Sequence, residues 1–428
     1  MKMKAGFSFY KEREFIDTVI GQIPNQWGVV PLKKVVEINR ESRDPSTESP
    51  DGEFLYIDIE SIEGNTGIIS NPKKILGRDA PSRARRVVHY KDVIMSTVRP
   101  YLKAFAIVPK EYDSQICSTG LAVLSCRNNI LPDYLLEVLF SSVVIEQCTR
   151  MMVGGQYPAL NESQVSQIII PLPASQEQEN IARILSTVDG AIRRTGEIIA
   201  KTELLKKGLM HELLSRGIGH REFKDREIGK LPREWEVVRL GIKGRFQYGI
   251  TTSALEESSG VRLLRITDIT NHGIDWSKTP YCNVTADEFR KYKLRVGDVL
   301  FARIGATTGK TCYIDRPVEA VFGSYLIRFQ PSGALDTRFL YYYAQSRIYW
   351  NQVNRKKEGQ LKKGLNIVTL GSLLFPLPAL AEQQEIANTL LKVDNKLELE
   401  RKEKGSLEKT KQGLMDLLLT GKIRIKVV

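Results

Sequence analysis

The sequence PLPASQEQENIARILSTVD at residues 171–189 occurs a second time, as PLPALAEQQEIANTLLKVD at residues 376–394. Of the 19 aligned positions, 11 are identical, and the likeness continues without a gap to KKGLM at 206–210 and KQGLM at 411–415. The copies begin 205 residues apart in a chain of 428 residues. Solenoid repeats recur every 20–50 residues or so, so this distance indicates the duplication of a whole domain.

A second duplicated motif precedes each copy of the first. IGQIPNQW at residues 20–27 matches IGKLPREW at residues 228–235. Between the two motifs the halves of the chain differ widely. The pattern therefore indicates one frame that is repeated and one surface that is varied.

Both repeated tails are predicted to be helices of a coiled coil. Their apolar residues recur at alternating spacings of three and four, and each tail spans about 40 residues, or roughly 60 Å at 1.5 Å per residue. Polar residues weaken each apolar seam, so we expect the two helices to pack against each other; two ordinary core helices are the alternative, against which the length argues. The predicted seam positions are Ile181, Leu185, Val188, Ile192, Thr195, Ile199, Thr202, Lys206, Leu209 and Leu213 in the first helix, and Ile386, Leu390, Val393, Leu397, Glu400, Lys404, Leu407, Lys411, Leu414 and Leu418 in the second.

The variable blocks carry mixed helix and strand signals, which predicts an α+β domain in each half. One helix is expected over residues 133–148 and its counterpart over 337–350, each followed by a loop that keeps Gly-Gln and then Leu-Asn. The expected strands are residues 54–59, 92–96 and 104–108, with counterparts at 263–269, 298–302 and 311–314. The predicted division of the chain is 1–172 and 218–377 for the two domains, and 173–217 and 378–428 for the two helical segments, the second with a C-terminal tail.

Composition favours a polyanionic partner. The net charge is +13 and the isoelectric point is near 9.3. For a protein of the cytoplasm this favours DNA or RNA, although solubility alone is the alternative. A cytoplasmic location without membrane contact is expected, because no apolar run reaches the ~18 residues of a membrane span, the N-terminus is charged, and the five cysteines include no CxxC pair.

Catalytic motifs are mostly absent. IGATTGKT at residues 304–311 resembles a phosphate-binding loop, but it has three residues between its glycines where the motif needs four. The four histidines do not have metal-ligand spacing, and neither a nucleophile elbow nor a glycine-rich cofactor loop is found. These observations favour a binding protein; an NTPase built around Gly309, Lys310 and Thr311 is one alternative.

The two duplicated motifs, Pro-Leu-Pro followed by Glu-Gln, Ile-Ala and Val-Asp, and Ile-Gly-x-[Ile/Leu]-Pro-x-x-Trp, resemble those of the specificity (S) subunits of type I restriction-modification systems. The resemblance covers nearly the whole chain. It implies two target recognition domains, each reading one half of a bipartite, asymmetric site in double-stranded DNA, and two helices packed as an antiparallel coiled coil that fixes the unread gap.

The same resemblance implies a chain with no catalytic activity and no cofactor of its own. Two methyltransferase (M) subunits, which use S-adenosylmethionine, and two translocase-nuclease (R) subunits, which use ATP and magnesium, would dock on it. A stand-alone DNA-binding regulatory protein without methyltransferase partners is the second hypothesis.

Candidate DNA-binding residues follow from loop position and side-chain chemistry, since arginine pairs well with guanine and glutamine with adenine, while basic residues hold phosphates. We expect base contacts from Thr97, Arg99, Lys103, Gln156 and Tyr157 in the first domain and from Arg303, Thr307, Thr308, Gln360 and Lys362 in the second. We expect phosphate contacts from Arg83, Arg85, Arg86 and Lys91 in the first domain and from Lys310, Lys356 and Lys357 in the second. Asn161 and Asn366 are expected to satisfy loop backbone groups, and residues 341–343 to be helix core.

Overall fold

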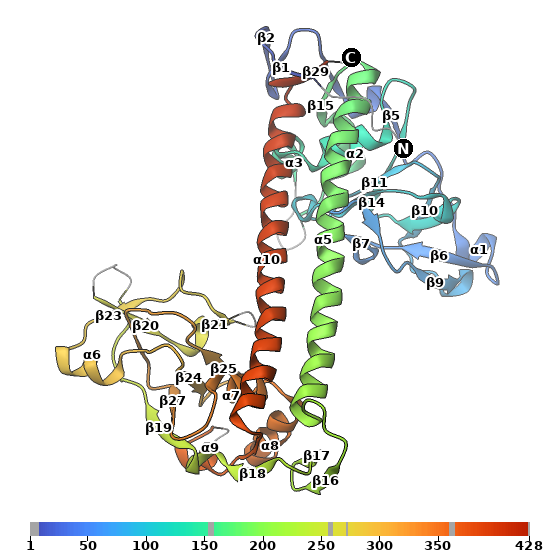
Figure 1. The fold of residues 1–428 in the computed structure, drawn as a ribbon. Helices are drawn as coiled ribbons and strands as arrows, with labels where there is room; N and C mark the ends of the chain where they lie inside the picture. The colour runs from blue at the N-terminus through green and yellow to red at the C-terminus, as the bar shows by residue number, and fades with distance from the viewer. Residues whose placement is uncertain (1–7, 153–157, 256–259, 271–272, 359–363, 427–428) are drawn as a thin grey trace. The chain divides into compact units, whose positions relative to one another are not determined.

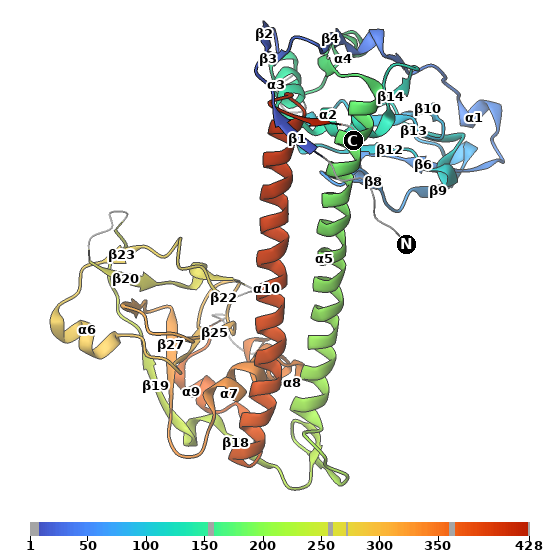
Figure 2. The same ribbon diagram turned by 45° about the horizontal axis from the view of Figure 1, so that its top comes forward.

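The structure is a computed structural model that describes residues 8–152, 158–255, 260–270, 273–358 and 364–426 (Figures 1 and 2). The chain forms two compact units, which are Met1–Gly196 with Lys402–Val428 (unit 1) and Glu197–Arg401 (unit 2). The long helices α5 (Ser175–Ser215) and α10 (Leu380–Leu418) each contribute one end to each unit.

Unit 1 is built around two four-stranded sheets. Its strands are β1 (Ser8–Lys11), β2 (Phe15–Thr18), β3 (Gly21–Pro24), β4 (Gly28–Pro31), β5 (Val36–Ile38), β6 (Glu53–Ile57), β7 (Ile62–Glu63), β8 (Ile68–Ile69), β9 (Lys73–Leu76), β10 (Ala84–Val88), β11 (Val93–Ser96), β12 (Phe105–Ile107), β13 (Gln115–Ser118), β14 (Leu121–Cys126), β15 (Ile169–Leu172) and β29 (Ile423–Lys426). The sheets have the orders β12-β11-β14-β5 and β10-β13-β6-β9, and only the β13–β6 pair is parallel among the described strands of these sheets. Antiparallel pairs join β1 to β29, β2 to β3, β4 to β15 and β7 to β8.

Unit 2 repeats this topology. Its strands are β16 (Phe223–Arg226), β17 (Gly229–Pro232), β18 (Glu236–Arg239), β19 (Gly244–Tyr248), β20 (Val261–Leu264), β21 (Ile269–Thr270), β22 (Gly273–Ile274), β23 (Tyr281–Cys282), β24 (Val299–Ala302), β25 (Thr311–Tyr313), β26 (Ala320–Phe322), β27 (Leu326–Pro331) and β28 (Leu374–Leu377). The sheets β25-β24-β27-β19 and β26-β20-β23 correspond to the two sheets of unit 1, and the β20–β26 pair is again parallel. The α+β duplication predicted from the sequence is therefore confirmed.

The short helices are α1 (Pro45–Glu48), α2 (Pro132–Phe140), α3 (Ser142–Met151) and α4 (Glu162–Gln167) in unit 1, and α6 (Ala286–Tyr292), α7 (Thr337–Tyr343), α8 (Arg347–Glu358) and α9 (Ile367–Gly371) in unit 2. Three short helices of each unit correspond, α2, α3 and α4 to α7, α8 and α9, whereas α1 lies between β5 and β6 and α6 lies between β23 and β24.

The prediction of one helix after residue 132 and one after residue 336 was wrong, because each is divided in two. Ser141 is extended (φ −67°, ψ 154°), and its hydroxyl accepts a hydrogen bond from the Val144 amide, so it begins α3. In unit 2 the Ser346 hydroxyl accepts a bond from the Tyr349 amide in the same way.

The strand predicted at residues 263–269 also ends early, at Leu264. The reason is that the Asp268 carboxylate accepts a bond from the Arg265 amide and turns the chain.

The coiled-coil prediction is confirmed within each unit. Residues 175–196 lie antiparallel to 402–418 in unit 1, and residues 197–215 lie antiparallel to 380–401 in unit 2 (Figures 1 and 2). Every predicted seam position is buried or half-buried. The seams join the domain cores, since Ile181 and Leu418 cluster with Trp27 in unit 1 and Ile386 and Leu390 cluster with Trp235 in unit 2.

The duplicated tryptophan and glutamate bind each other. The Trp27 indole donates to Glu177 Oε2 at 3.0 Å, and the Trp235 indole donates to Glu382 Oε2 at 3.0 Å. In unit 1 the guanidinium of Arg424 completes the group with two bonds of 2.9 Å to Glu177. In unit 2 a histidine takes this place, with His220 Nε2 2.9 Å from Glu382 Oε1. In each unit, the tryptophan of one duplicated motif and the glutamate of the other thus form one buried polar cluster.

The glutamine that follows each glutamate ties the start of the long helix to the loop before α2 or α7. Gln178 accepts a bond from the Leu131 amide and donates to the Pro173 carbonyl, both at 2.9 Å. Gln383 accepts from the Asp336 amide at 2.9 Å and donates to the Pro378 carbonyl at 2.8 Å. Both glutamines are almost fully buried, so their backbone bonds explain why the residue recurs.

A lysine of each seam is neutralised by the aspartate that ends the repeated Val-Asp. Lys411 Nζ lies 2.7 Å from Asp189 Oδ2 and 3.4 Å from Glu137 Oε2 of α2. In unit 2, Lys206 Nζ lies 2.6 Å from Asp394, and the Tyr342 hydroxyl of α7 donates to Asp394 at 2.9 Å. Each pair joins the two helices to the domain packed on them.

Glu137 gives unit 1 a pH dependence that Tyr342 does not give unit 2. Burial raises the pKa of the Glu137 carboxyl from its ordinary 4.5 to about 7, with Lys411 opposing the rise and Asp189 adding to it. The folded chain therefore holds this proton when the unfolded chain has released it. The stability that results is fully present below pH 4.5 and is lost as the pH rises to about 7.

We predict that Glu137→Gln, which cannot ionise, removes this loss. Between pH 5 and pH 8 the free energy of unfolding should fall by roughly 2 kcal/mol less in the variant than in the wild type. Urea titration of the full chain at both pH values measures the difference. Glu146→Gln, at an exposed position on α3, is the control and should behave like the wild type. An effect of Glu137→Gln that is equal at both pH values would contradict the account.

Candidate nucleic-acid interface

In unit 1 the structure brings together the two loops that the sequence singled out. The loop that follows β11 pairs with residues 158–160, because the Leu160 amide donates to the Thr97 carbonyl at 2.9 Å and the Arg99 amide donates to the Pro158 carbonyl at 3.0 Å. Candidate residues Thr97 and Arg99 therefore lie beside residues 158–160, which follow Gln156 and Tyr157 in the sequence. Those two residues themselves lie outside the described ranges.

Two of the candidates in this loop are engaged in holding its shape. The Thr97 hydroxyl donates to the Gly120 carbonyl at 3.0 Å, and Thr97 is only 7% exposed. Lys103 Nζ donates to the Phe140 carbonyl at 2.8 Å, and burial lowers the pKa of this ammonium. Arg99 is half-buried, and the predicted base contact is compatible with this position.

The four candidate phosphate contacts of unit 1 are not equivalent. Arg85 pairs with Asp44 at 3.0 Å, and Arg86 donates to the Leu121 carbonyl, with burial lowering the pKa of its guanidinium. Arg83 is exposed, and its carbonyl accepts from the Thr119 amide, next to the Gly120 that binds Thr97.

Lys91 is placed apart from the other candidates of unit 1. It precedes β11 whereas Thr97 follows it, and six residues of extended chain span roughly 20 Å. Lys91 is therefore close to Thr97 in the sequence but lies at the opposite end of β11.

In unit 2 three strand ends converge on Arg303. Its guanidinium lies over the Tyr248 ring, 4.7 Å from the centroid, and donates to the Ser324 carbonyl at 3.4 Å. The Arg303 amide donates to the Tyr325 carbonyl at 3.0 Å, and its own carbonyl accepts from the Leu365 amide at 2.8 Å. The last bond repeats the contact between Leu160 and Thr97.

The glycine-rich loop after Arg303 is a β-hairpin connection between β24 and β25. A phosphate-binding loop leads from a strand into a helix whose N-terminus faces the phosphates, and no helix begins at this loop, which the structure describes throughout. Thr308 is buried, with its hydroxyl donating to the Gly305 carbonyl at 2.7 Å, and Thr307 is half-buried. Lys310 Nζ donates to the Ile269 carbonyl at 3.0 Å. This geometry argues against the NTPase alternative.

The remaining candidates of unit 2 lie on α8 and beyond it. Lys356 is exposed on α8, and Lys357 belongs to the same helix. Gln360 and Lys362 lie outside the described residues. The predictions for Asn161 and Asn366 are confirmed, since their side chains accept bonds from the amides of Gln164 and Thr369 at the starts of α4 and α9.

The sequence analysis did not single out the aromatic residues at the same edges, or the exposed leucine beside one of them. Tyr248 ends β19 and stacks with Arg303, while Tyr325, just before β27, is 55% exposed. In unit 1, Tyr101 and Leu102 are 45% and 60% exposed in the loop after β11. The available signal was an aromatic residue directly beside a predicted strand end or loop.

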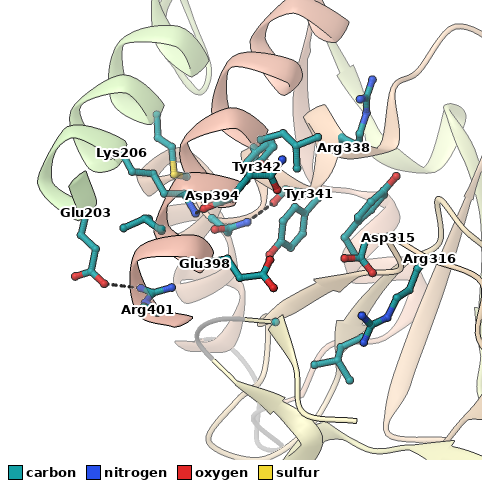
Figure 3. Close-up of a pocket in the computed structure, with 18 of the residues that line it drawn as sticks. Glu203, Lys206, Asp315, Arg316, Arg338, Tyr341, Tyr342, Asp394, Glu398 and Arg401 are labelled. Carbon is teal, nitrogen blue, oxygen red and sulfur yellow. Dashed lines mark hydrogen bonds and ion pairs between the residues drawn. The ribbon is translucent and has the colours of Figure 1, made fainter. Parts of the chain in front are cut away.

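A cavity of about 590 Å³ in unit 2 lies between α7 and the helix pair (Figure 3). Its charged groups include two ion pairs of 2.6 Å, between Glu203 and Arg401 and between Lys206 and Asp394. Tyr341 and Tyr342 also line it. Tyr342 and Tyr343 are almost fully buried, as predicted for this helix, and Tyr341 is half-buried. These two ion pairs join α5 to α10, so the cavity lies at a polar joint between the domain and the helices.

Within the described ranges, no group of three or more His, Cys, Asp or Glu side chains is placed to hold a metal ion. Over the same residues, no helix has the length and apolar character that a membrane crossing requires.

These features define a protein with two edge surfaces that differ, carried by one repeated helical frame. Residues 24–204 and 232–409 match the family described as the type I restriction modification DNA specificity domain. The chain therefore belongs to the family of type I restriction-modification specificity subunits, which bind DNA.

Known proteins agree with this assignment. The chain is 30% identical to the putative type I restriction enzyme MjaX specificity subunit of Methanocaldococcus jannaschii, and 29% identical to the MjaVIII specificity subunit of the same organism; each alignment covers 98% of both chains. It is also similar to a chain in a solved structure described as the basis of complex assembly and conformational transition of the type I R-M system. That chain is 28% identical, with a TM-score of 0.56, over 94% of this chain and 99% of the other.

We predict that Arg303 contributes to DNA binding through its planar, stacked guanidinium. Arg303→Lys keeps the charge but loses the stack on Tyr248, and should lower affinity for DNA roughly tenfold. Tyr248→Phe keeps the ring and should retain the affinity. Arg245→Ala, which removes an exposed arginine from the other end of β19, is the matched control. Fluorescence anisotropy of a labelled duplex gives the affinities; equal binding by Arg303→Lys and wild type would remove Arg303 from the interface.

Proposed function

We propose that this chain is the non-catalytic subunit that chooses the DNA sequence for a type I restriction-modification complex. Each unit reads one half of a bipartite, asymmetric site, with residues 1–172 and 218–377 as the recognition domains. Two M subunits methylate adenine with S-adenosylmethionine, and two R subunits use ATP and magnesium to translocate and cut DNA. The complex acts in the cytoplasm.

The observation that carries this proposal is that the two units share the same frame contacts but differ at their edges. The Trp–Glu, Gln–backbone and Lys–Asp contacts recur in both units. At the edges, Thr97 of unit 1 stands where unit 2 has Arg303 stacked on Tyr248. Because base readout depends on the side chains at the groove, two unlike edges favour two unlike half-sites.

We infer that α5 and α10 set the number of unread bases between the half-sites. Both helices pass without a break from one unit to the other, and their ion pairs fix the register within each unit. A stiff spacer between two modules suits two patches on one face of a duplex, where equivalent positions recur every 34–36 Å or so.

The first test supplies the missing subunits. The purified chain should show no S-adenosylmethionine turnover, and should direct adenine methylation to one asymmetric, gapped motif once M subunits are added. Methylome sequencing of a host that expresses chain and M subunits gives the motif. Turnover by the chain alone would contradict the non-catalytic role, and a palindromic motif would contradict two different edges. Failure of M subunits to bind, together with sequence-specific DNA binding by the chain alone, would favour a stand-alone regulator.

The second test lengthens the spacer. Gly196 faces the Lys404 ammonium, 3.9 Å from its ideal Cβ position, so insertions after Thr195 and after Lys404 are opposite each other. Seven residues at each point keep the seam in register and add roughly 10 Å, or about three base pairs.

Both half-sites should stay unchanged in the lengthened chain while the gap grows by about three base pairs. A control insertion of seven residues in the exposed β2–β3 turn at Val19 should leave the motif unchanged. Altered half-sites with an unchanged gap would show that the M subunits, and not the helices, position the domains.

A further inference from the structure

The loop after β11 in unit 1 presents two adjacent large apolar side chains to solvent. Tyr101 is 45% exposed and Leu102 is 60% exposed. They lie in a 3₁₀ turn, Pro100–Leu102, between the candidate residues Arg99 and Lys103. Single exposed apolar residues are ordinary on protein surfaces, but here a pair is displayed together at the edge where DNA is proposed to bind.

The turn is held firmly from both ends. Arg99 and Lys103 both adopt left-handed backbone conformations, with φ of 46° and 55°, which non-glycine residues adopt at a cost. The Leu102 amide donates to the Arg99 carbonyl at 2.9 Å, and the Lys103 amide donates to the Pro100 carbonyl at 2.9 Å. Surrounding contacts that maintain two such residues fix the direction in which Tyr101 and Leu102 point.

Neighbouring segments support the same turn. The Asn65 amide donates to the Lys103 carbonyl at 3.0 Å, and Gly64 approaches so closely that an added Cβ would lie 2.9 Å from the Leu102 carbonyl oxygen. Lys103 Nζ is bound to the Phe140 carbonyl, and Pro100 is buried. The apolar pair is thus mounted on a rigid support, which limits the entropy that contact with a ligand would cost.

The repeated frame does not require this pair. At the positions that align with Tyr101 and Leu102, unit 2 has Thr307 and Thr308, which have small side chains. The exposed aromatic residues of that edge, Tyr248 and Tyr325, come from other strands. An apolar turn found in only one of two duplicated domains belongs to the varied surface and not to the core.

We propose that Tyr101 and Leu102 form an apolar probe that packs against bases of the first half-site; this rests on the proposed function. The shared chemistry is contact with apolar base surface, which is either the exposed face of an unstacked base or a thymine methyl group. The turn is continuous with Thr97 and Arg99, which pair with the second candidate loop of the same edge. Polar groups of that edge fix the position of the protein along the DNA. Tyr101 and Leu102 add contacts that distinguish between bases and do not depend on charge.

The test uses the complex of the full chain with M subunits and a duplex that carries the motif found for the wild type. Tyr101→Ala and Leu102→Ala should each lower affinity roughly tenfold, while binding to a duplex with a scrambled first half-site should not change. The slope of log affinity against log salt should stay at the wild-type value, because no phosphate contact is lost. Arg83→Ala is the contrasting variant, and should make the slope shallower.

Matched variants exclude loss of folding. Val19→Ala removes a 78% exposed apolar residue elsewhere in unit 1 and should leave affinity unchanged. Tyr101→Phe and Leu102→Met keep apolar bulk and should bind like the wild type. A duplex with uracil in place of thymine identifies a methyl contact, and 2-aminopurine that brightens on binding identifies an unstacked base.

Three results would overturn the proposal: unchanged affinity in both alanine variants, an altered salt slope, or a loss of M-subunit binding that accounts for the loss of DNA binding. If the wild-type complex directs no site-specific methylation, the proposed function fails and not the probe.

Discussion

A lysine inside each half of the helix pair holds the fold together. Lys411 lies among Asp189 and Glu137 in unit 1, and Lys206 is bound by Asp394 in unit 2. A lysine in an apolar seam is costly unless it is paired. The Lys411 and Lys206 side chains are 12% and 19% exposed, and their aspartates are 32% and 28% exposed, so solvent screens part of each attraction. The pairing therefore fixes the register of the helices, and through Glu137 and Tyr342 it also fixes how each domain sits on its own helices.

The same logic explains which residues recur. Tryptophan with glutamate, glutamine with backbone, and lysine with aspartate are buried or half-buried polar pairs, and an apolar residue in place of one partner leaves the other without its hydrogen bond. The edges beyond them carry no such requirement, and there the two units diverge. Variation of the loops at these edges can proceed without disturbing the frame, since none of the frame contacts involves those loops in the described part of the chain.

Much of the fold could be predicted from the sequence because its determinants are periodic or local. The seam positions follow from a seven-residue spacing, and Asn161 and Asn366 cap helices by a local side-chain bond. The break at Ser141 was missed because apolar residues continue on both sides of it, and only the hydroxyl bond to the Val144 amide marks the start of a new helix.

The candidate site was predicted less well because it depends on long-range contacts. Arg86 and Lys103 looked like free cations in the sequence, but their bonds are to carbonyls 35 and 37 residues away. Tyr248 meets Arg303 only because β19 and β24 end at the same edge of a sheet.

The central claim is that one frame carries two interchangeable reading surfaces. It is tested most directly by a chain in which residues 236–373 are replaced by a copy of 28–168, so that both units carry the first edge. With M subunits, this chain should direct methylation to a palindromic motif made of two inverted copies of the first half-site. A motif that remains asymmetric, or that still contains the second half-site, would contradict the account.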